Sequence, residues 1–197
     1  MKQFISTQFF SRWSRRMAPA VLAVTAVGLF LVLSAGARDG DQDDGDHDDG
    51  EHSKVQIGFE IAPVDLDLRG KNRALVGLGS YIVNAQSSCS DCHTSPNFAP
   101  GGNPYLGQPE QINTADYLGG GRRFPGGIVS RNLTPDPITG LPADLTLDQF
   151  KNVIHTGADP DNPGRLLQIM PWPVFRNMRD RDLDAIYEYL SASPSLP

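Results

Sequence analysis

The sequence predicts an all-α domain in which about three to five helices are joined by long irregular loops. Apolar residues recur at helical spacing in three separate segments, while the chain between them is rich in Gly and Pro and has no strand pattern. The stretch 96–143 is unusually long for a loop in a compact domain. Such a loop is reasonable when it wraps something that is not protein.

The first predicted helix runs from about residue 70 to residue 87. It carries Leu75, Leu78 and Ile82 on one stripe, with Gly79 between them. A glycine inside a helix costs about 1 kcal/mol relative to alanine. We therefore expect Gly79 to be there because another element approaches the helix closely.

Two further helices are predicted toward the C-terminus. Thr146 and Gln149 have the spacing of a capping box, so a helix is expected over residues 146–157. The last helix is expected to begin near Asp180 or Asp182, whose charges favour a helix N-terminus, and to end before Pro194. Its apolar stripe consists of Leu183, Ile186, Tyr187 and Leu190.

The N-terminal residues predict export. Residues 1–16 carry only positive charges, residues 18–33 are uncharged and almost wholly apolar, and Ala35-Gly36-Ala37 has the small residues after which signal peptidase cuts. We expect a signal peptide over residues 1–37; the alternative is an uncleaved anchor that associates with the inner membrane through residues 18–37. Both predict a periplasmic protein, soluble or anchored.

Residues 38–54 are predicted to be an acidic disordered spacer, and residues 55–197 one compact domain. The segment 38–53 contains eight acidic residues and no large apolar one, so it cannot bury enough surface to offset the cost of ordering. The whole chain has 23 Asp and Glu against 17 Lys and Arg, a net charge of −6. This charge balance excludes a typical nucleic-acid-binding protein.

Residues 89–93 read CSDCH and contain both cysteines of the chain. Two cysteines at i and i+3 followed directly by histidine match the attachment sequence of haem c. Residues three apart on a helical turn face the same way, so both thiols can reach the two vinyl groups along one side of a porphyrin. The motif predicts one covalent haem c on Cys89 and Cys92, with His93 as an axial ligand of the iron.

Other uses of a cysteine pair fit the spacing less well. A thiol-disulfide oxidoreductase needs its first cysteine at a helix N-terminus after a strand, and no strand is predicted before Cys89. A disulfide between residues three apart closes a very small loop and stabilises little. Zinc needs two further ligands, and outside the spacer only His155 remains among the histidines. An oxidoreductase that uses Cys89 and Cys92 is kept as the alternative function.

A second axial ligand is expected from a methionine. Only Met170 and Met178 lie outside the predicted signal peptide. Met170 precedes Pro171, which disfavours helical geometry, so its thioether can project from a stiffened loop. Met178 lies just before the last helix, where packing is its default role. We predict Met170, because a His/Met pair raises the potential and suits electron transfer.

The remaining polar candidates concern the haem carboxylates. Arg122, Arg123 and Arg131 can pair with propionates through the guanidinium, although each is also a plausible surface residue in a glycine-rich loop. Trp172 is expected either to hydrogen-bond a propionate through its indole or to close the methionine side of the pocket. His155 is interpreted as a surface residue near a helix C-terminus.

Several short stretches around the motif carry a family resemblance. They are Gly79-Ser80-Tyr81-Ile82-Val83 before the motif, Asn132-Leu133-Thr134-Pro135-Asp136, Gly164-Arg165, Met170-Pro171-Trp172, and Asp182-Leu183 with Ala185-Ile186 and Tyr189-Leu190. With CSDCH they resemble class I c-type cytochromes, most closely the single-haem domains in cytochrome subunits of periplasmic alcohol and aldehyde dehydrogenases.

The resemblance implies a cytochrome c fold whose first and last helices cross, with Gly79 at the crossing and Tyr187 or Tyr189 packed against it. It implies single-electron transfer, as a carrier or as a subunit docked on a dehydrogenase or oxidase, and no substrate chemistry of its own. This chain departs from the family in two ways. Arg179 stands where a threonine usually precedes the last helix, so Asp180 is expected to cap it. The haem motif occurs once, whereas the dehydrogenase subunits commonly carry three haem domains.

Overall fold

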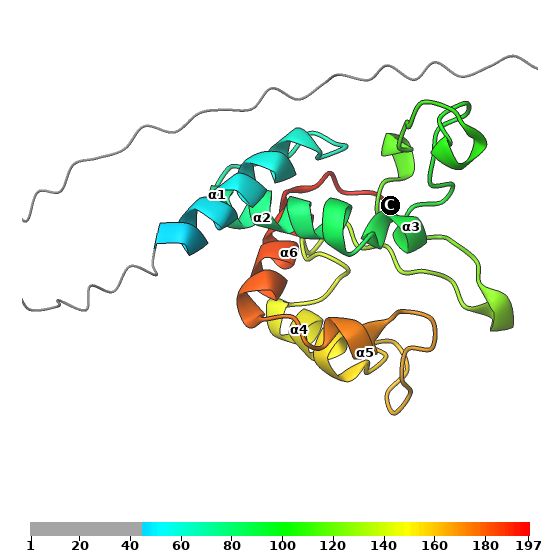
Figure 1. The fold of residues 1–197 in the computed structure, drawn as a ribbon. Helices are drawn as coiled ribbons and strands as arrows, with labels where there is room; N and C mark the ends of the chain where they lie inside the picture. The colour runs from blue at the N-terminus through cyan, green and yellow to red at the C-terminus, as the bar shows by residue number, and fades with distance from the viewer. Residues whose placement is uncertain (1–44) are drawn as a thin grey trace, which may run out of the picture. The chain divides into compact units, whose positions relative to one another are not determined.

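The computed structural model describes residues 45–197, in which helices are linked by long loops (Figure 1). Residues 1–44 lie outside the described residues, and with them the predicted signal peptide and the first part of the predicted spacer. The helical segments are, in order, α1 (Gly45–Glu60), α2 (Arg73–Tyr81), η1 (Ile82–Gln86), α3 (Cys89–His93), η2 (Pro104–Leu106), η3 (Thr114–Asp116), η4 (Pro125–Gly127), α4 (Leu147–Thr156), α5 (Trp172–Phe175) and α6 (Asp180–Ala192).

The prediction of an all-α fold is confirmed. Between residues 45 and 197 the chain forms isolated β-bridges, such as Phe98 with Ile112, but no strand. The three predicted helices are found as α2, α4 and α6, and α1, α3 and α5 add to them. No helix in this part of the chain is long and apolar enough to cross a membrane.

The crossing of α2 and α6 organises the core. Gly79 allows it, because a Cβ at this position would collide with the backbone of Ala185 and the side chain of Tyr189. Tyr189 is fully buried there, and the backbone amide of Asn72, which caps α2, donates to Glu188 at 2.7 Å. The close approach predicted for Gly79 and the packing of Tyr189 against it are therefore observed. Tyr187 instead packs on Phe150 and donates its hydroxyl to the Leu145 carbonyl at 2.9 Å.

Helix α1 begins within the predicted acidic spacer, since residues 45–54 are helical. Its C-terminal half lies antiparallel to α2, as the cation–π contacts of Lys54 with Tyr81 and of Arg73 with Phe59 show. Gly58 lies directly against the backbone of α2, and its carbonyl accepts a 2.6 Å hydrogen bond from buried Ser80. The acidic composition does not reveal this helix, since tertiary packing rather than propensity holds it.

The boundaries of the other helices refine the predictions. The predicted helix over 70–87 is a shorter α2 followed by η1, one turn of π-helix, and the cysteine motif forms a helix of its own. In α4 the capping box is present in both directions between Thr146 and Gln149. In α6 the N-cap is Arg179, which makes no capping hydrogen bond, so the prediction of an Asp180 cap is wrong. Asp180 faces α4 instead, where it pairs with Lys151 at 3.5 Å.

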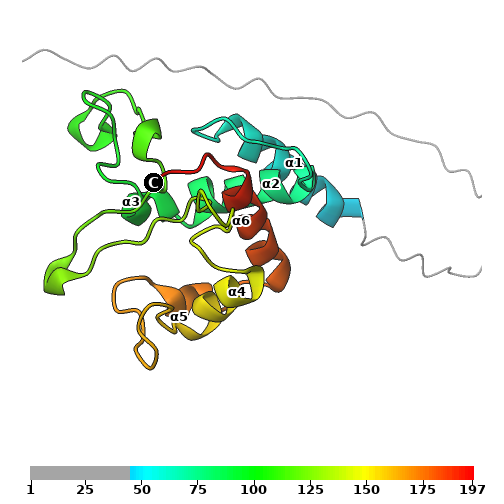
Figure 2. The ribbon, with the colours of Figure 1, turned by 180° about the vertical axis from the view of Figure 1, so that it is seen from behind.

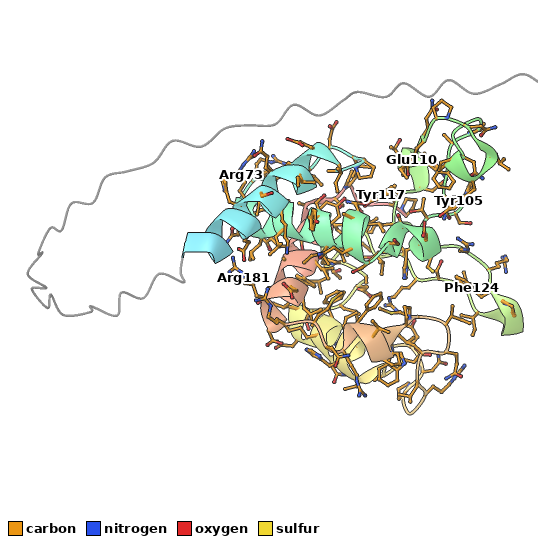
Figure 3. The ribbon with its side chains drawn as sticks, in the orientation of Figure 1. Arg73, Tyr105, Glu110, Tyr117, Phe124 and Arg181 are labelled. Atoms are coloured by element: carbon orange, nitrogen blue, oxygen red, sulfur yellow. The ribbon has the colours of Figure 1, made fainter. Side chains whose placement is uncertain are left out.

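The views from the two sides show how these parts are distributed (Figures 1 and 2). Helix α1 lies beside α2, while α4 and α5 lie together beyond α6. Residues 94–143 form extended loops that begin at α3. The residues labelled in Figure 3 show two of these loops, one carrying Tyr105 and Glu110 and the other carrying Phe124.

Substitution of Gly79 by alanine tests the crossing. The added Cβ collides with backbone atoms of α6, which cannot move aside as a flexible side chain can, so we expect Gly79→Ala to lower the free energy of unfolding by about 1–3 kcal/mol. The control is Gly50→Ala in α1, where a Cβ meets nothing within 4 Å. Chemical denaturation of both variants measures the difference, and equal stability of the two would contradict the close crossing.

Candidate haem site

The cysteine motif sits on a short helix whose start and end are both fixed. Ser88 takes the left-handed conformation (φ 48°, ψ 42°), which turns the chain out of η1 and into α3. At the other end the Gly120 amide donates to the His93 carbonyl at 2.7 Å, and the Leu118 amide donates to the buried Thr94 hydroxyl at 3.0 Å. These bonds hold α3 against the loop that follows it.

The motif opens onto a cavity of about 460 Å³. Cys89, Cys92 and His93 all line this cavity, and Met170 lines it as well. The rest of the wall is largely apolar and comes from many parts of the chain, including Val83, Phe124, Leu133, Phe150, Ile154, Leu167, Phe175, Leu183, Ile186 and Leu190. A large apolar cavity with a few convergent polar groups is the usual form of a ligand or cofactor site.

The ring of His93 is oriented by a backbone carbonyl. Its Nδ1 lies 2.7 Å from the Arg131 carbonyl oxygen, and because a carbonyl can only accept, Nδ1 carries the proton. The lone pair is therefore on Nε2, as a metal ligand requires. Burial lowers the pKa of His93 and so favours the neutral imidazole that can bind a metal.

The Cys89 thiol is poorly suited to thiol exchange. Cys89 and Cys92 both face the cavity and form no disulfide. Burial raises the pKa of the Cys89 thiol to about 12, with Cys92 the next cause, whereas an exchange-active cysteine has a lowered pKa. Within residues 45–197 there is also no group of three or more His, Cys, Asp and Glu side chains that could hold a metal ion such as zinc.

Both candidate methionines line the cavity and are half-buried. Met170 lies two residues before the start of α5, and its carbonyl accepts a 2.8 Å hydrogen bond from the Trp172 amide, which bends the chain sharply at Pro171. Met178 lies between α5 and α6 and also lines a second cavity beside α1. Cavity lining alone does not separate the two, so the choice of Met170 stays a prediction.

The predicted carboxylate-binding residues are not all at the cavity. Of the three arginines only Arg131 lines it; its Nε donates to the Ala143 carbonyl at 2.9 Å and its guanidinium pairs with Asp161. Arg122 points to the outside of α3, where it donates to the Asp91 carbonyl and to Asn97. Arg123 is exposed and absent from the cavity wall. Arg122 and Arg123 are therefore not part of the cavity wall, and their role as partners of the propionates stays a prediction.

Trp172 also lies outside the cavity wall. Its Nε1 donates to the Leu167 carbonyl at 3.2 Å, and its ring lies on Gly157, where a Cβ would collide with it. The indole is thus engaged by protein backbone, and a propionate partner for it stays a prediction. Through these contacts Trp172 ties the chain next to Met170 to the end of α4. Gly157 is the C-cap of α4 in the left-handed conformation (φ 70°), and its lack of a side chain makes this contact possible.

The Arg131 carbonyl and the Asp161 carboxylate complete the site, and neither was predicted. A backbone acceptor has no residue-type signature, so His93 could not be matched to it from the sequence. Asp161 stands in an Asp159-Pro160-Asp161-Asn162 turn in which Asp159 accepts from the amides of Asp161 and Asn162 at 3.0 and 3.2 Å. Only the folded loop brings this turn to Arg131.

Comparison with known proteins bears on this site. The chain is 31% identical over 118 residues to the gluconate 2-dehydrogenase cytochrome c subunit of Pantoea cypripedii and 30% identical over 118 residues to the alcohol dehydrogenase (quinone) cytochrome c subunit of Gluconobacter oxydans. Each match covers 60% of this chain. The chain is related to cytochrome c subunits of dehydrogenases.

The chain spans only 23% and 21% of the length of those two relatives. It is also 31% identical over 116 residues to the alcohol dehydrogenase (quinone) cytochrome c subunit of Gluconacetobacter polyoxogenes, of which it spans 21%. No family model matches the chain. No solved structure matches it either.

The ion pair of Arg131 can be tested independently of any cofactor. Arg131→Gln removes the pair with Asp161 and weakens the bond to Ala143, so we expect the free energy of unfolding to fall by about 1–2 kcal/mol. Arg123→Gln, at an exposed position in the same loop, is expected to change it by less than about 0.5 kcal/mol. Urea titration compares the two, and an Arg131 effect no larger than that of Arg123 would contradict the assignment.

Proposed function

We propose that this protein binds one haem c and transfers single electrons in the periplasm, as a mono-haem carrier or as the electron-transfer subunit of a dehydrogenase. Cys89 and Cys92 would hold the porphyrin covalently, and His93 and Met170 would ligate the iron. One observation carries the proposal: α3 brings both thiols and an imidazole to the wall of a single apolar cavity that Met170 also lines.

The residues around the cavity fit this role. The Arg131 carbonyl fixes the His93 ring with Nε2 free to bind a metal. Largely apolar side chains line the cavity, so a haem held there would lie in an environment of low dielectric constant. When bound, haem supplies a reversible one-electron couple whose potential a His/Met ligand pair raises.

Arg131 is the candidate partner for the haem carboxylates. It is the one arginine of the three predicted that lines the cavity, and a guanidinium matches a carboxylate bidentately. Its present partner Asp161 is mostly exposed, with 65% of the side chain accessible, so water can take over the solvation of Asp161 if the guanidinium turns inward. Arg131 would then offset part of the negative charge at the cavity edge.

The partner and the location follow from the relatives and from the N-terminal sequence. The relatives are described as cytochrome c subunits of gluconate and alcohol dehydrogenases, which favours a dehydrogenase as electron donor. Residues 1–37 have the sequence features of an export signal. In this proposal the protein makes no bonds in a substrate, and it associates with redox partner proteins outside the inner membrane.

A haem stain of a denaturing gel tests covalent attachment. The exported protein is expected to keep its colour after denaturation, because thioether bonds survive loss of the fold. The double variant Cys89→Ala/Cys92→Ala is expected to lose the colour. A colourless wild-type band with two alkylatable thiols would contradict the proposal and support the thiol-disulfide alternative.

The axial ligand is tested by comparing the two methionines that line the cavity. Met170→Ala is expected to abolish the far-red sulfur-to-iron absorption band of the oxidised protein, because it removes the only thioether bound to the iron. Met178→Ala is the matched control and is expected to keep the band. The reverse result would assign the ligand to Met178.

A further inference from the structure

Residues 167–178, here called the methionine segment because they contain Met170, pack against the C-terminal turn of α4. Trp172 lies on Gly157, the Leu167 amide donates to the Gly157 carbonyl at 2.8 Å, and the Trp172 indole donates to the Leu167 carbonyl at 3.2 Å. These contacts fix the chain on both sides of Met170. None of them involves a group that titrates near neutral pH.

His155, in the last turn of α4, adds a contact that can titrate. Its Nδ1 lies 3.1 Å from the carbonyl oxygen of Arg176, just after α5, and its Nε2 lies 3.4 Å from a carboxylate oxygen of Asp180, at the start of α6. The imidazole therefore bridges three helical elements. The sequence indicated only a surface histidine near a helix C-terminus.

The two partners of His155 make the same demand on the ring, and a neutral ring can meet only one of them. Both the carbonyl and the carboxylate are acceptors, so each contact needs an N–H, and a neutral imidazole has only one. The imidazolium has two and can make both bonds at once. Histidine is the side chain whose charge ordinarily changes between pH 5 and 8. The bridge is thus complete when His155 is protonated and loses one bond when it is neutral.

Charged side chains of two elements, α4 and α6, lie around His155. On α6, Asp180 and Asp184 face α4, and Lys151 of α4 binds Asp184 at 2.7 Å and Asp180 at 3.5 Å. The hydrogen bond with Asp184 raises the pKa of Lys151, so this lysine keeps its charge throughout the neutral range. The side chains of Arg176 and Arg179 are exposed. Two carboxylates therefore face one lysine and the histidine.

We propose that His155 is a positioning residue for the methionine segment, and that the protonated imidazolium fixes residues 167–178 against α4 and α6 by binding Arg176 and Asp180 together. This wall of the cavity is then held more firmly at pH 6 than at pH 8.5. The inference concerns the segment itself; only its effect on iron ligation rests on the proposed function.

Amide hydrogen exchange on the full chain tests the proposal without reference to haem. At pH 6, after correction for intrinsic rates, we expect peptides covering residues 168–178 to exchange about three- to tenfold faster in His155→Gln than in the wild type. At pH 8.5 the ratio should fall toward one. Asp180→Asn removes the carboxylate partner of His155. The exchange of these peptides in this variant should therefore depend on pH as weakly as in His155→Gln.

His52→Gln, at an exposed position of α1, is the matched control and should behave as the wild type at both pH values. Equal exchange in wild type and His155→Gln at pH 6, or a ratio that does not change with pH, would overturn the proposal. The far-red sulfur-to-iron band gives a second readout, expected to weaken with rising pH in the wild type and not in His155→Gln. A pH-dependent exchange ratio in a protein that lacks this band would support the role of His155 and contradict Met170 as ligand.

Discussion

The contact of Gly79 with α6 is the constraint on which the rest of the domain depends. Helix α2 runs through η1 into α3, so the position of α2 determines where the cysteines and His93 lie. Helix α6 follows the segment that contains Met170. The two helices meet backbone to backbone at Gly79 and Ala185. This contact therefore fixes the side of the cavity that carries His93 relative to the side that carries Met170.

Two parts of the loops between the helices, within residues 124–133 and 159–171, contribute to the wall of the cavity. The loop at residues 118–131 fixes α3 through Leu118 and Gly120 and orients His93 through the Arg131 carbonyl. The guanidinium of Arg131 then pairs with Asp161 on the opposite loop. A long glycine-rich connection is stable here because its backbone groups have specific partners, and its apolar side chains face a space suited to a cofactor.

Local patterns predicted the elements that local forces determine. The helical stripes, the capping box at Thr146 and the close approach at Gly79 were all readable, since each depends on residues near in sequence or on the absence of a side chain. Helix α1 was missed because Gly58 and Phe59 stabilise it only through contacts with α2. The haem contacts of Arg122, Arg123 and Trp172 stay predictions. In the structure each of these side chains is engaged by a neighbour or by solvent, an arrangement that only the folded loops create.

The central claim is that α3 and the cavity wall hold one covalently bound haem. The intact mass of the protein, purified after export and measured under denaturing conditions, tests it most directly. The account predicts the mass of the exported chain plus one haem, and the mass of the chain alone when both cysteines are replaced by alanine. A wild-type mass equal to that of the bare chain, or smaller by the two hydrogens lost in a disulfide, would contradict the claim.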